Sequence, residues 1–412
     1  MSKYSVYNPK GLEMQFDPNK QTENADKLKA AGSQEVNIFA DNFKFAQTLK
    51  LNLGFDFKAL GIDWTAEAIY SKTLNDIYYK NLSIEETGKT FGQETGYEWD
   101  NRPMFRTTTK GTPYAYVYGL YNTNKGYTVN LSLKAEKHFN FGLDLMASYT
   151  WTRSMSVNSG TSSVAGSNWM FNTTYRNPNN PELGFSAYNV PHNIQASAYY
   201  HVAYGSSKQW QSTIGLIYQA KSGSPYVIEM YGDMNGDGAR GNDLMWIPTD
   251  EQIDKMHFVA TTVNNSNNTY PLITRVLGEG YKGNLSEEQQ RALLKQWIAE
   301  DSYMRDHRGQ YFERYADNLA FEHHFDLHFA QKYSFKVAGQ INSLELSFDI
   351  INLGNLLNKD WGHTYGDGFG RYFSPFNYEG DGMFKFDGTH INRDYNSYNS
   401  RWRGQIGLRY TF

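Results

Sequence analysis

The sequence has no cysteine and no long apolar run, and these absences limit the kinds of protein that it can encode. The lack of cysteine fits an oxidising compartment, in which stray thiols are avoided, but many cytosolic proteins lack cysteine too. Transmembrane helices are excluded, because the mean hydropathy is −0.66 and no run of about 18 apolar residues occurs. A β-barrel escapes this test, since every second residue of its strands can be polar.

Strong charge and recognisable catalytic motifs are also missing. The formal net charge is −4 and the isoelectric point is near 6.2, which gives no electrostatic reason to expect a nucleic-acid partner. Serine, histidine and aspartate are present, but none lies in a GxSxG or other nucleophile context, and no Walker or dinucleotide fingerprint appears. No convincing paired-carboxylate site is visible either. We therefore predict that the protein is not an enzyme.

The sequence does contain stretches in which apolar and polar residues strictly alternate. Its last stretch, Arg401–Phe412, reads RWRGQIGLRYTF, with apolar residues or glycine on one face and three arginines on the other. Alternation over about twelve residues is the period-two signature of a strand with two unlike faces. At about 3.3 Å per residue and a tilt near 45°, such a strand rises about 28 Å, close to the hydrocarbon thickness of a bilayer. Taken alone, this stretch equally fits an amphipathic strand of a soluble sandwich.

The same pattern recurs along the chain and predicts about nine strands. Several reach ten or more residues, whereas soluble strands average about five or six. The predicted strands are Phe45–Lys58, Ile62–Tyr70, Tyr127–His138, Leu143–Trp151, Ile194–Tyr204, Trp210–Ile228, Leu319–Phe335, Leu344–Ile350 and Arg401–Phe412.

Short turns and long loops separate these strands in regular succession. The long loops span about 81–124, 154–189, 231–317 and 360–400. Transmembrane barrels have short periplasmic turns and long external loops, whereas a soluble sandwich gives no reason for long loops at one end. We therefore predict an all-β fold, an antiparallel transmembrane β-barrel segment. Its polar faces would line a lumen, which explains the acidic residues in mid-strand: Asp56, Glu67, Glu136, Asp144, Asp326 and Asp349.

The longest loop, 231–317, is predicted to contain a helix near 287–304. Ser286 and Gln289 fit a capping box, in which the serine caps the helix and the glutamine reaches back. The apolar residues that follow at helical spacing are Leu293, Leu294, Trp297, Ile298 and Met304. We expect this stripe to pack on the rest of the loop rather than on a membrane.

Three stretches resemble TonB-dependent outer-membrane receptors, in particular the group with an N-terminal carboxypeptidase-regulatory-like domain. They are FKFAQTLKLNLGFDFK (Phe43–Lys58), AIYSKTLNDIYYKNL (Ala68–Leu82) and LELSFDIINLGNLLNKDWG (Leu344–Gly362). The aromatic C-terminus also resembles the closing strand of outer-membrane barrels, where it serves as an assembly signal. The resemblance implies a 22-stranded barrel plugged by an N-terminal domain, which a TonB-contacting segment precedes.

Neither a plug nor a TonB-contacting segment is recognisable in this sequence. The nine strands, or ten if Glu35–Ala40 pairs, would be the C-terminal portion of the barrel, so residues 1–412 are expected to be one part of a longer protein. The start, MSKYSVYNPKG, lacks the charged and apolar segments of a secretory signal. For a location in the outer membrane of a Gram-negative bacterium, the natural chain would therefore begin further upstream.

One loop segment suggests a metal site. Asp233, Asn235 and Asp237 place oxygens at alternate positions before Gly238, as in the first half of an EF-hand calcium loop. The twelfth position is leucine rather than glutamate, although Asp243 lies beside it. These four acidic and amide residues are candidate calcium ligands. The alternative is a plain Asx/Gly turn without metal.

Two other stretches are candidate binding sites. His324 and His328 share a strand face but would stand about 13 Å apart, which is too far for one metal ion and favours a hydrated lumen. The loop Tyr365–Phe386 mixes glycine, aspartate and many aromatic residues. It could contact a sugar or a peptide, or pack on itself.

The function implied by the resemblance is TonB-coupled uptake of an unidentified nutrient. The partners implied are outer-membrane lipid, the missing plug and barrel half, and TonB acting through the plug; we expect the chain alone not to be competent. Two alternatives stay open at this point. One is a passive outer-membrane pore or adhesin, and the other is a soluble β-rich carbohydrate-binding module.

Overall fold

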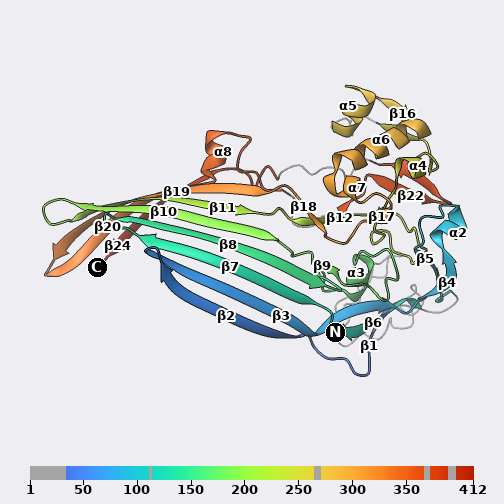
Figure 1. The fold of residues 1–412 in the computed structure, drawn as a ribbon, viewed down its shortest axis with the longest axis horizontal. Coiled ribbons are helices and arrows are strands. Elements are labelled where there is room, and N and C mark those ends of the chain that lie inside the picture. Colours follow the sequence, from blue (N-terminus) through green and yellow to red (C-terminus); the bar gives the residue numbers. More distant parts are fainter. Residues whose placement is uncertain (1–33, 111–113, 264–270, 366–371, 388–395) are drawn as a thin grey trace, which may run out of the picture.

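A nine-stranded antiparallel meander forms the wall of the molecule (Figure 1). The computed structural model describes residues 34–110, 114–263, 271–365, 372–387 and 396–412. Each wall strand pairs with the next in the chain. The strands are β2 (Gln47–Ala59), β3 (Ile62–Asn81), β7 (Tyr127–His138), β8 (Leu143–Ser156), β10 (His192–Tyr204), β11 (Trp210–Lys221), β19 (Glu322–Val337), β20 (Gln340–Ile351) and β24 (Arg403–Thr411).

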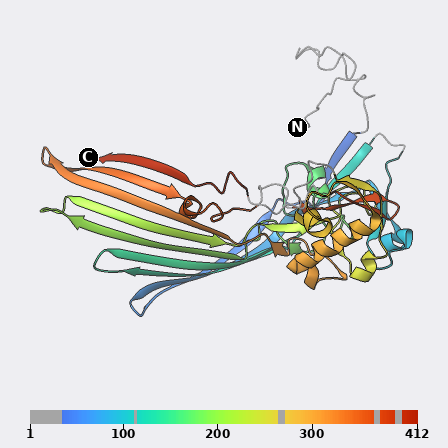
Figure 2. The ribbon, with the colours of Figure 1, turned by 90° about the horizontal axis from the view of Figure 1, so that it is seen from above.

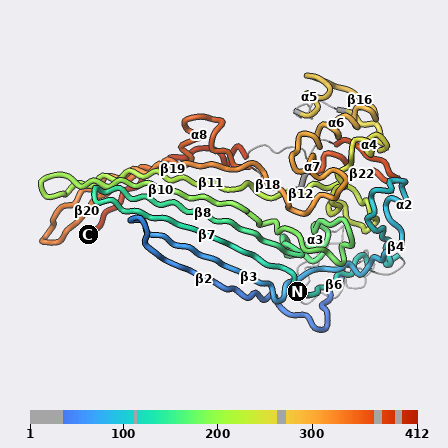
Figure 3. The backbone as a smooth tube through the Cα atoms, viewed as in Figure 1, coloured from blue at the N-terminus to red at the C-terminus, as the bar shows by residue number. Residues whose placement is uncertain are grey.

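Tight turns connect the strands at one end of the wall, where the chain also ends (Figure 3). Leu60 and Gly61 both have positive φ angles, 56° and 69°, and so do Ala338 and Gly339, at 50° and 86°. Two-residue loops with two positive φ angles match the right-handed twist of the flanking strands. These turns therefore hold β2 against β3 and β19 against β20 in register.

One face of the wall is continuously apolar. Leu53 of β2 lies opposite Ala68 of β3, which in turn lies opposite Leu131 of β7. The same face continues to the last strand, in which Ile406 and Leu408 are 74% and 72% exposed. An apolar surface of this extent is unusual on a soluble protein and suits contact with hydrocarbon.

The other face of the wall is polar and internally hydrogen-bonded. Asn52 donates to Glu67 across the β2–β3 pair at 2.9 Å. The Lys134 ammonium lies 2.7 Å from the Glu136 carboxylate on β7. Such side chains need water or partners, so this face agrees with the predicted lumen.

The hydrophobic core lies in the long loops instead of the wall. Figure 2 shows helices and short strands gathered at the end of the wall opposite the tight turns. We call this region the loop domain. Its fully buried side chains include Phe91, Trp169, Ile228, Met245, Ile253 and Phe312. The loops therefore fold as a packed unit with a core of their own.

Many short elements build the loop domain. Its helices are α2 (Phe91–Thr95), α3 (Ala165–Met170), α4 (Asp250–Ile253), α5 (Pro271–Leu277), α6 (Glu287–Glu300) and α7 (Ser302–Asp306). Its strands include β4 (Ile84–Thr90), β5 (Pro103–Thr107), β12 (Pro225–Ile228), β13 (Trp246–Ile247), β14 (His257–Phe258), β15 (Thr261–Val263), β16 (Gly283–Leu285), β17 (Gln310–Tyr311), β18 (Asp317–Asn318), β21 (Tyr372–Phe373), β22 (Phe376–Gly380) and β23 (Met383–Phe386). Two further elements adjoin the wall, β9 (Gly184–Phe185) beside β8 and α8 (Leu353–Leu357) after β20.

The predicted helix is confirmed as α6 followed by α7. Ser286 caps α6 and Gln289 reaches back to the serine N–H, which completes the capping box. Leu293, Leu294 and Trp297 are buried in the core of the loop domain, as expected. The helical stretch breaks at Asp301, which caps α7.

Three predictions about boundaries were wrong. The stretch 81–124 is structured, because it contains β4, α2, β5 and β6 (Tyr114–Thr123). The stretch Trp210–Ile228 forms two strands, β11 and β12, rather than one. Leu319 and Phe321 precede β19, so their alternation belongs to the loop. In the last two cases, local alternation extended the predicted strand past the point where its pairing partner changes.

The N-terminal strand is β1 (Gln34–Phe39), and it pairs with β6 in parallel. Strand β6 in turn pairs with the end of β3. Glu35–Phe39 therefore does pair, but it extends the sheet beside the loop domain and does not add a strand to the meander.

The described wall is an open sheet, not a closed barrel. Within the described ranges, β2 pairs only with β3 and β24 pairs only with β20. Both edge strands run from the loop domain towards the tight turns, so the two edges are parallel to each other. The predicted total of 22 strands stays a prediction. No helix in the described ranges is long and apolar enough to span a membrane.

A pair of neighbouring residues on β7 tests which face meets lipid. Leu133 lies on the apolar face opposite Ala66 and Tyr149, whereas Ser132 lies on the polar face opposite Glu67 and Thr150. We expect Leu133→Arg to destabilise the membrane-inserted protein by about 2–4 kcal/mol, because arginine near the bilayer midplane is costly, and Ser132→Arg to have little effect.

The measurement is urea unfolding of each variant of the full-length protein in phospholipid vesicles. Equal losses for the two variants would show that the apolar face does not meet hydrocarbon.

Candidate functional site

A buried arginine ties two external loops together in the loop domain. Arg102 donates to Asp100 through Nε at 3.0 Å, to Asp243 through Nη1 at 3.0 Å and to the Leu244 carbonyl through Nη2 at 3.0 Å. Burial alone would lower the pKa of Arg102, but Asp100 and Asp243 raise it, so the guanidinium stays charged. The β4–β5 loop is thereby fixed to the β11–β19 loop.

The predicted calcium ligands lie in this second loop and mostly hydrogen-bond within it. Asp233 accepts from the Gly238 N–H at 2.9 Å, and Asp237 accepts from the Ala239 N–H at 2.7 Å. Asn235 accepts from the Asp237 N–H at 3.0 Å. Asp243 accepts from Arg102 and from the Met234 N–H, at 3.0 Å each. The bonds of Asn235 and Asp237 are those of two successive Asx turns, whereas Asp233 and Asp243 bond to groups further along or outside these turns.

Further side chains complete this acidic cluster. Asn242 donates to Asp237 at 2.8 Å, and Glu229 is buried near Asp243. Burial raises the pKa of Glu229 to about 8 and that of Asp237 to about 6. One oxygen each of Glu229, Asp233 and Asn242 is buried without a hydrogen-bond partner.

The residues present fit a metal ion only in part. Three buried oxygens have no partner, which an ion could supply, but the Asp237 and Asp243 carboxylates already accept hydrogen bonds. In the part of the chain that the structure describes, no group of three His, Asp or Glu side chains is arranged to hold a metal. The hydrogen bonds thus favour the Asx/Gly turn over the calcium site, and calcium binding itself is untested.

Three loops meet at a half-open cavity of about 530 Å³. We call it the aromatic pocket. The β4–β5 loop and the start of β5 supply three lining residues, the β8–β10 loop three more, and β13 and β17 one each. The lining residues are Trp99, Asn101, Pro103, Tyr175, Arg176, Asn177, Trp246 and Tyr311.

The aromatic rings of this pocket hold one another in place. Tyr175 stacks on Tyr311 with ring centroids 4.1 Å apart, and Trp246 meets Tyr311 edge-on at 4.9 Å. The Tyr311 hydroxyl donates to Asp100 at 2.7 Å, and Asp100 is held by Arg102. Burial, and then the Asp100 charge, raise the pKa of Tyr311, so its hydroxyl remains a donor. The buried ion pair of Arg102 and Asp100 thus holds Tyr311, and with it the pocket wall, in position.

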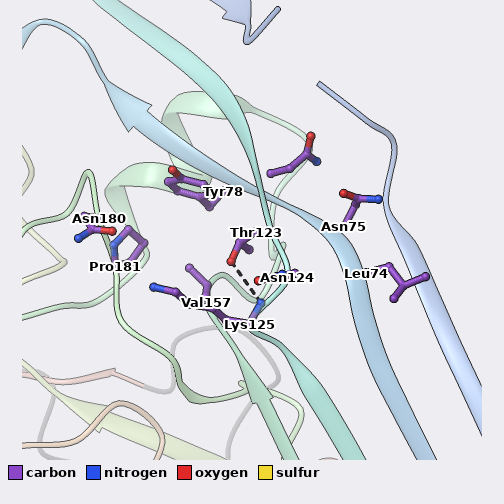
Figure 4. A pocket seen from close by; sticks show the side chains of 10 residues that line it. Leu74, Asn75, Tyr78, Thr123, Asn124, Lys125, Val157, Asn180 and Pro181 are labelled. Atoms are coloured by element: carbon purple, nitrogen blue, oxygen red, sulfur yellow. Dashed lines mark hydrogen bonds between the residues drawn. The ribbon is translucent and has the colours of Figure 1, made fainter. Parts of the chain in front are cut away.

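Another cavity, of about 400 Å³, lies where the wall meets the loops (Figure 4). Asn75 and Tyr78 reach it from β3, and Lys125 reaches it from the segment between β6 and β7. Asn180 and Pro181 close it from the β8–β10 loop. It has a single aromatic side chain, so it offers less for ligand recognition than the aromatic pocket.

His324 and His328 of β19 are on the polar face, as predicted. His328 contacts Asp349 at 2.5 Å, and His324 lies 3.2 Å from the Thr364 hydroxyl. Each has its own partner, which agrees with a lumen lining.

The described residues of the loop 365–386 pack on themselves. Phe376, Phe384 and Phe386 are buried in the core of the loop domain. Residues 366–371 of this loop lie outside the described ranges. Of the two interpretations of this loop, the structure supports self-packing for the described aromatic residues.

The architecture defines a class of protein. A meander with an apolar face, a polar face, tight turns at one end and a loop domain at the other is the design of outer-membrane β-barrels. The family model for the outer membrane beta barrel domain matches residues 2–358, and the chain belongs to this family. The protein is accordingly located in the outer membrane.

The comparisons with individual proteins are distant. No curated protein matches the chain. Among solved structures, the outer membrane transporter YddB from Escherichia coli is similar with a TM-score of 0.31 and 13% identity. The match covers 79% of this chain and 30% of that one, so the chain spans under a third of the transporter's length.

No sequence motif marks the aromatic pocket. Trp99, Tyr175, Trp246 and Tyr311 are spread over four stretches without a shared motif. Their proximity depends on the pairing of β13 with β17 and on the bonds of Arg102. The pocket depends on contacts between distant loops, which no local sequence pattern records.

The role of Arg102 can be tested by removing its charge. We expect Arg102→Met to destabilise the loop domain by about 3–5 kcal/mol, because Asp100 and Asp243 would be left buried without their partner. The control is Arg106→Gln, which breaks only the exposed ion pair with Glu85 and should cost less than about 1 kcal/mol. Thermal unfolding followed by tryptophan fluorescence measures both. Similar small losses would mean that Arg102 does not hold the loops.

The metal prediction has a direct test. Because the acidic loop already satisfies its Asp237 and Asp243 carboxylates, we expect no saturable calcium binding at about 1 mM, the range of weak extracellular sites. Isothermal titration calorimetry of the wild type and of Asp237→Asn should give the same flat response. Saturable binding that Asp237→Asn abolishes would establish the calcium site.

Proposed function

We propose that the chain is the C-terminal part of the barrel of a TonB-dependent outer-membrane receptor for nutrient uptake, and that it does not act alone. The observation that carries this proposal is that both edge strands of the wall lack a second pairing partner within the described ranges. Strands β2 and β24 each have one neighbour within the described ranges, and they run in the same direction.

An unpaired strand edge in hydrocarbon leaves backbone N–H and C=O groups without partners, which costs several kcal/mol for each group. Closing nine meander strands on themselves would require β2 to pair with β24 in parallel. An odd number of further antiparallel strands removes this conflict and gives an even total, as in bacterial single-chain barrels. Thirteen additional strands would give the total of 22 that the family resemblance implies.

The loop domain supports a receptor rather than a simple pore. It has a packed core and a cavity that three loops line. External loops of this kind present a rigid surface for capturing a ligand. Coupling to TonB, and the plug through which it acts, come from the resemblance of Phe43–Lys58 and Leu344–Gly362 to the receptor family.

A soluble carbohydrate-binding module fits the observations less well. Its aromatic and aliphatic strand faces would be buried against each other. Leu131, Phe329 and Leu346 are instead 46%, 42% and 52% exposed on one continuous face.

The proposal is tested by targeting residues 1–412 to the outer membrane with a borrowed signal peptide. We expect aggregation, because the open edges at β2 and β24 invite pairing between chains. Co-expression of the upstream half should restore a product that resists urea extraction and migrates differently after heating. The restored protein should also bind the purified C-terminal domain of TonB, and residues 1–412 alone should not.

Two outcomes would contradict the proposal. A heat-modifiable barrel formed by residues 1–412 alone would favour an autonomous pore. A restored full-length barrel that does not bind TonB would leave the outer-membrane barrel in place but remove the energy coupling.

A further inference from the structure

We propose that the aromatic pocket binds an acidic sugar residue of an oligosaccharide, with the sugar ring against the aromatic side chains and its carboxylate on Arg176. This deepens the proposed function by naming a ligand class for the loop domain. The inference rests on the proposed function for one point, which is that the pocket lies at the cell surface. Binding to the pocket does not require import.

The size and position of the pocket suit a small ligand. Its volume of about 530 Å³ lies within the range of about 300–1,000 Å³ that is typical of ligand pockets. Trp99, Tyr175 and Trp246 line the pocket and are only half-buried. The partly positive C–H groups of a sugar ring are attracted to the negative face of an aromatic ring.

Arg176 supplies a charge that has no ion-pair partner among the described residues. Its guanidinium lies over the Tyr175 ring at 5.2 Å, and its Nε donates to the Tyr175 hydroxyl at 3.0 Å. Among the described residues, no carboxylate forms an ion pair with Arg176, and its two terminal nitrogens donate no hydrogen bond. Those two nitrogens form the flat fork that binds a carboxylate through two parallel hydrogen bonds.

An amide provides a second polar contact. The single hydroxyl proton of Tyr311 is donated to Asp100 at 2.7 Å, and the Asn101 side-chain amide lies 3.1 Å from the same hydroxyl oxygen. Asn101 is exposed, so the end of its amide that faces away from Tyr311 can hydrogen-bond to a sugar hydroxyl. An aromatic wall, the Arg176 guanidinium and an exposed amide thus correspond to the ring, the carboxylate and the hydroxyls of a uronic acid.

The pocket is organised before a ligand arrives. Tyr311 is fixed by Asp100, and Asp100 is fixed by the buried Arg102. Tyr175 is held by its stacking on Tyr311. A preformed site loses less side-chain entropy on binding, so a few contacts can give measurable affinity.

The experiment uses the full-length protein in detergent and isothermal titration calorimetry. The probes are trigalacturonate, the neutral galactose trimer and trialanine. We expect trigalacturonate to bind most tightly, the neutral trimer at least tenfold more weakly and trialanine not at all, because charge-assisted bonds to arginine are about twice as strong as neutral ones.

Two substitutions locate the site. Arg176→Gln should weaken trigalacturonate binding about tenfold and leave the neutral trimer unchanged, whereas Tyr175→Ala should weaken both. The matched control is Arg305→Gln on α7, where the arginine is exposed and forms an ion pair with its neighbour Asp306. It should bind all three probes as the wild type does. Unchanged thermal unfolding of each variant shows that the loop domain is still folded.

Several outcomes would overturn the proposal. Equal binding of the charged and neutral trimers, unaffected by Arg176→Gln, would remove the role of the carboxylate. Binding of trialanine alone would identify a peptide as the ligand class. No binding of any probe to a protein that still binds TonB would reject the pocket while leaving the proposed function intact.

Discussion

The structure depends on one constraint, which is that backbone groups in hydrocarbon must find hydrogen-bond partners within the protein. Each interior wall strand meets this constraint by pairing on both sides, and strands of twelve or more residues keep that pairing across most of the wall. The constraint fails only at β2 and β24 within the described ranges. In hydrocarbon, both of these edges would need further pairing partners.

The wall cannot build a hydrophobic core in the usual way. Its apolar face is directed at lipid and its polar face at a lumen, so no apolar side chains are buried between layers as they are in a sandwich. Burial takes place in the loop domain instead, where the long loops pack around residues such as Ile228, Met245 and Phe312. Buried arginines tie the loops together: Arg102 joins the β4–β5 loop to the β11–β19 loop, and Arg314 donates to the Val157 carbonyl at 2.7 Å. Arg102 also holds Asp100, which positions Tyr311 in the aromatic pocket. The same contacts therefore stabilise the loop domain and shape the pocket.

Local sequence signals predicted the local features well. The capping box at Ser286, the short turns between paired strands and the alternation of the wall strands each depend on residues within a few positions of one another. Features that depend on distant partners were missed. Strand β6 was assigned to a loop, because its pairing with β3 and β1 connects segments far apart in the chain. The aromatic residues of 365–386 suggested a binding surface, yet those described there fill the core, since the sequence does not say which side of a loop meets another loop.

By itself, the sequence determined the fold class, the two unlike faces of the wall and the outer-membrane family, because period-two alternation and strand length are local consequences of the bilayer. It also determined that the long loops lie at one end. Only the tertiary structure decided that these loops share a core, that Arg102 lies between Asp100 and Asp243, and that Trp99, Tyr175, Trp246 and Tyr311 line one cavity. The physical reason is that such contacts join residues separated by tens to hundreds of positions, and no periodicity along the chain records which of them meet.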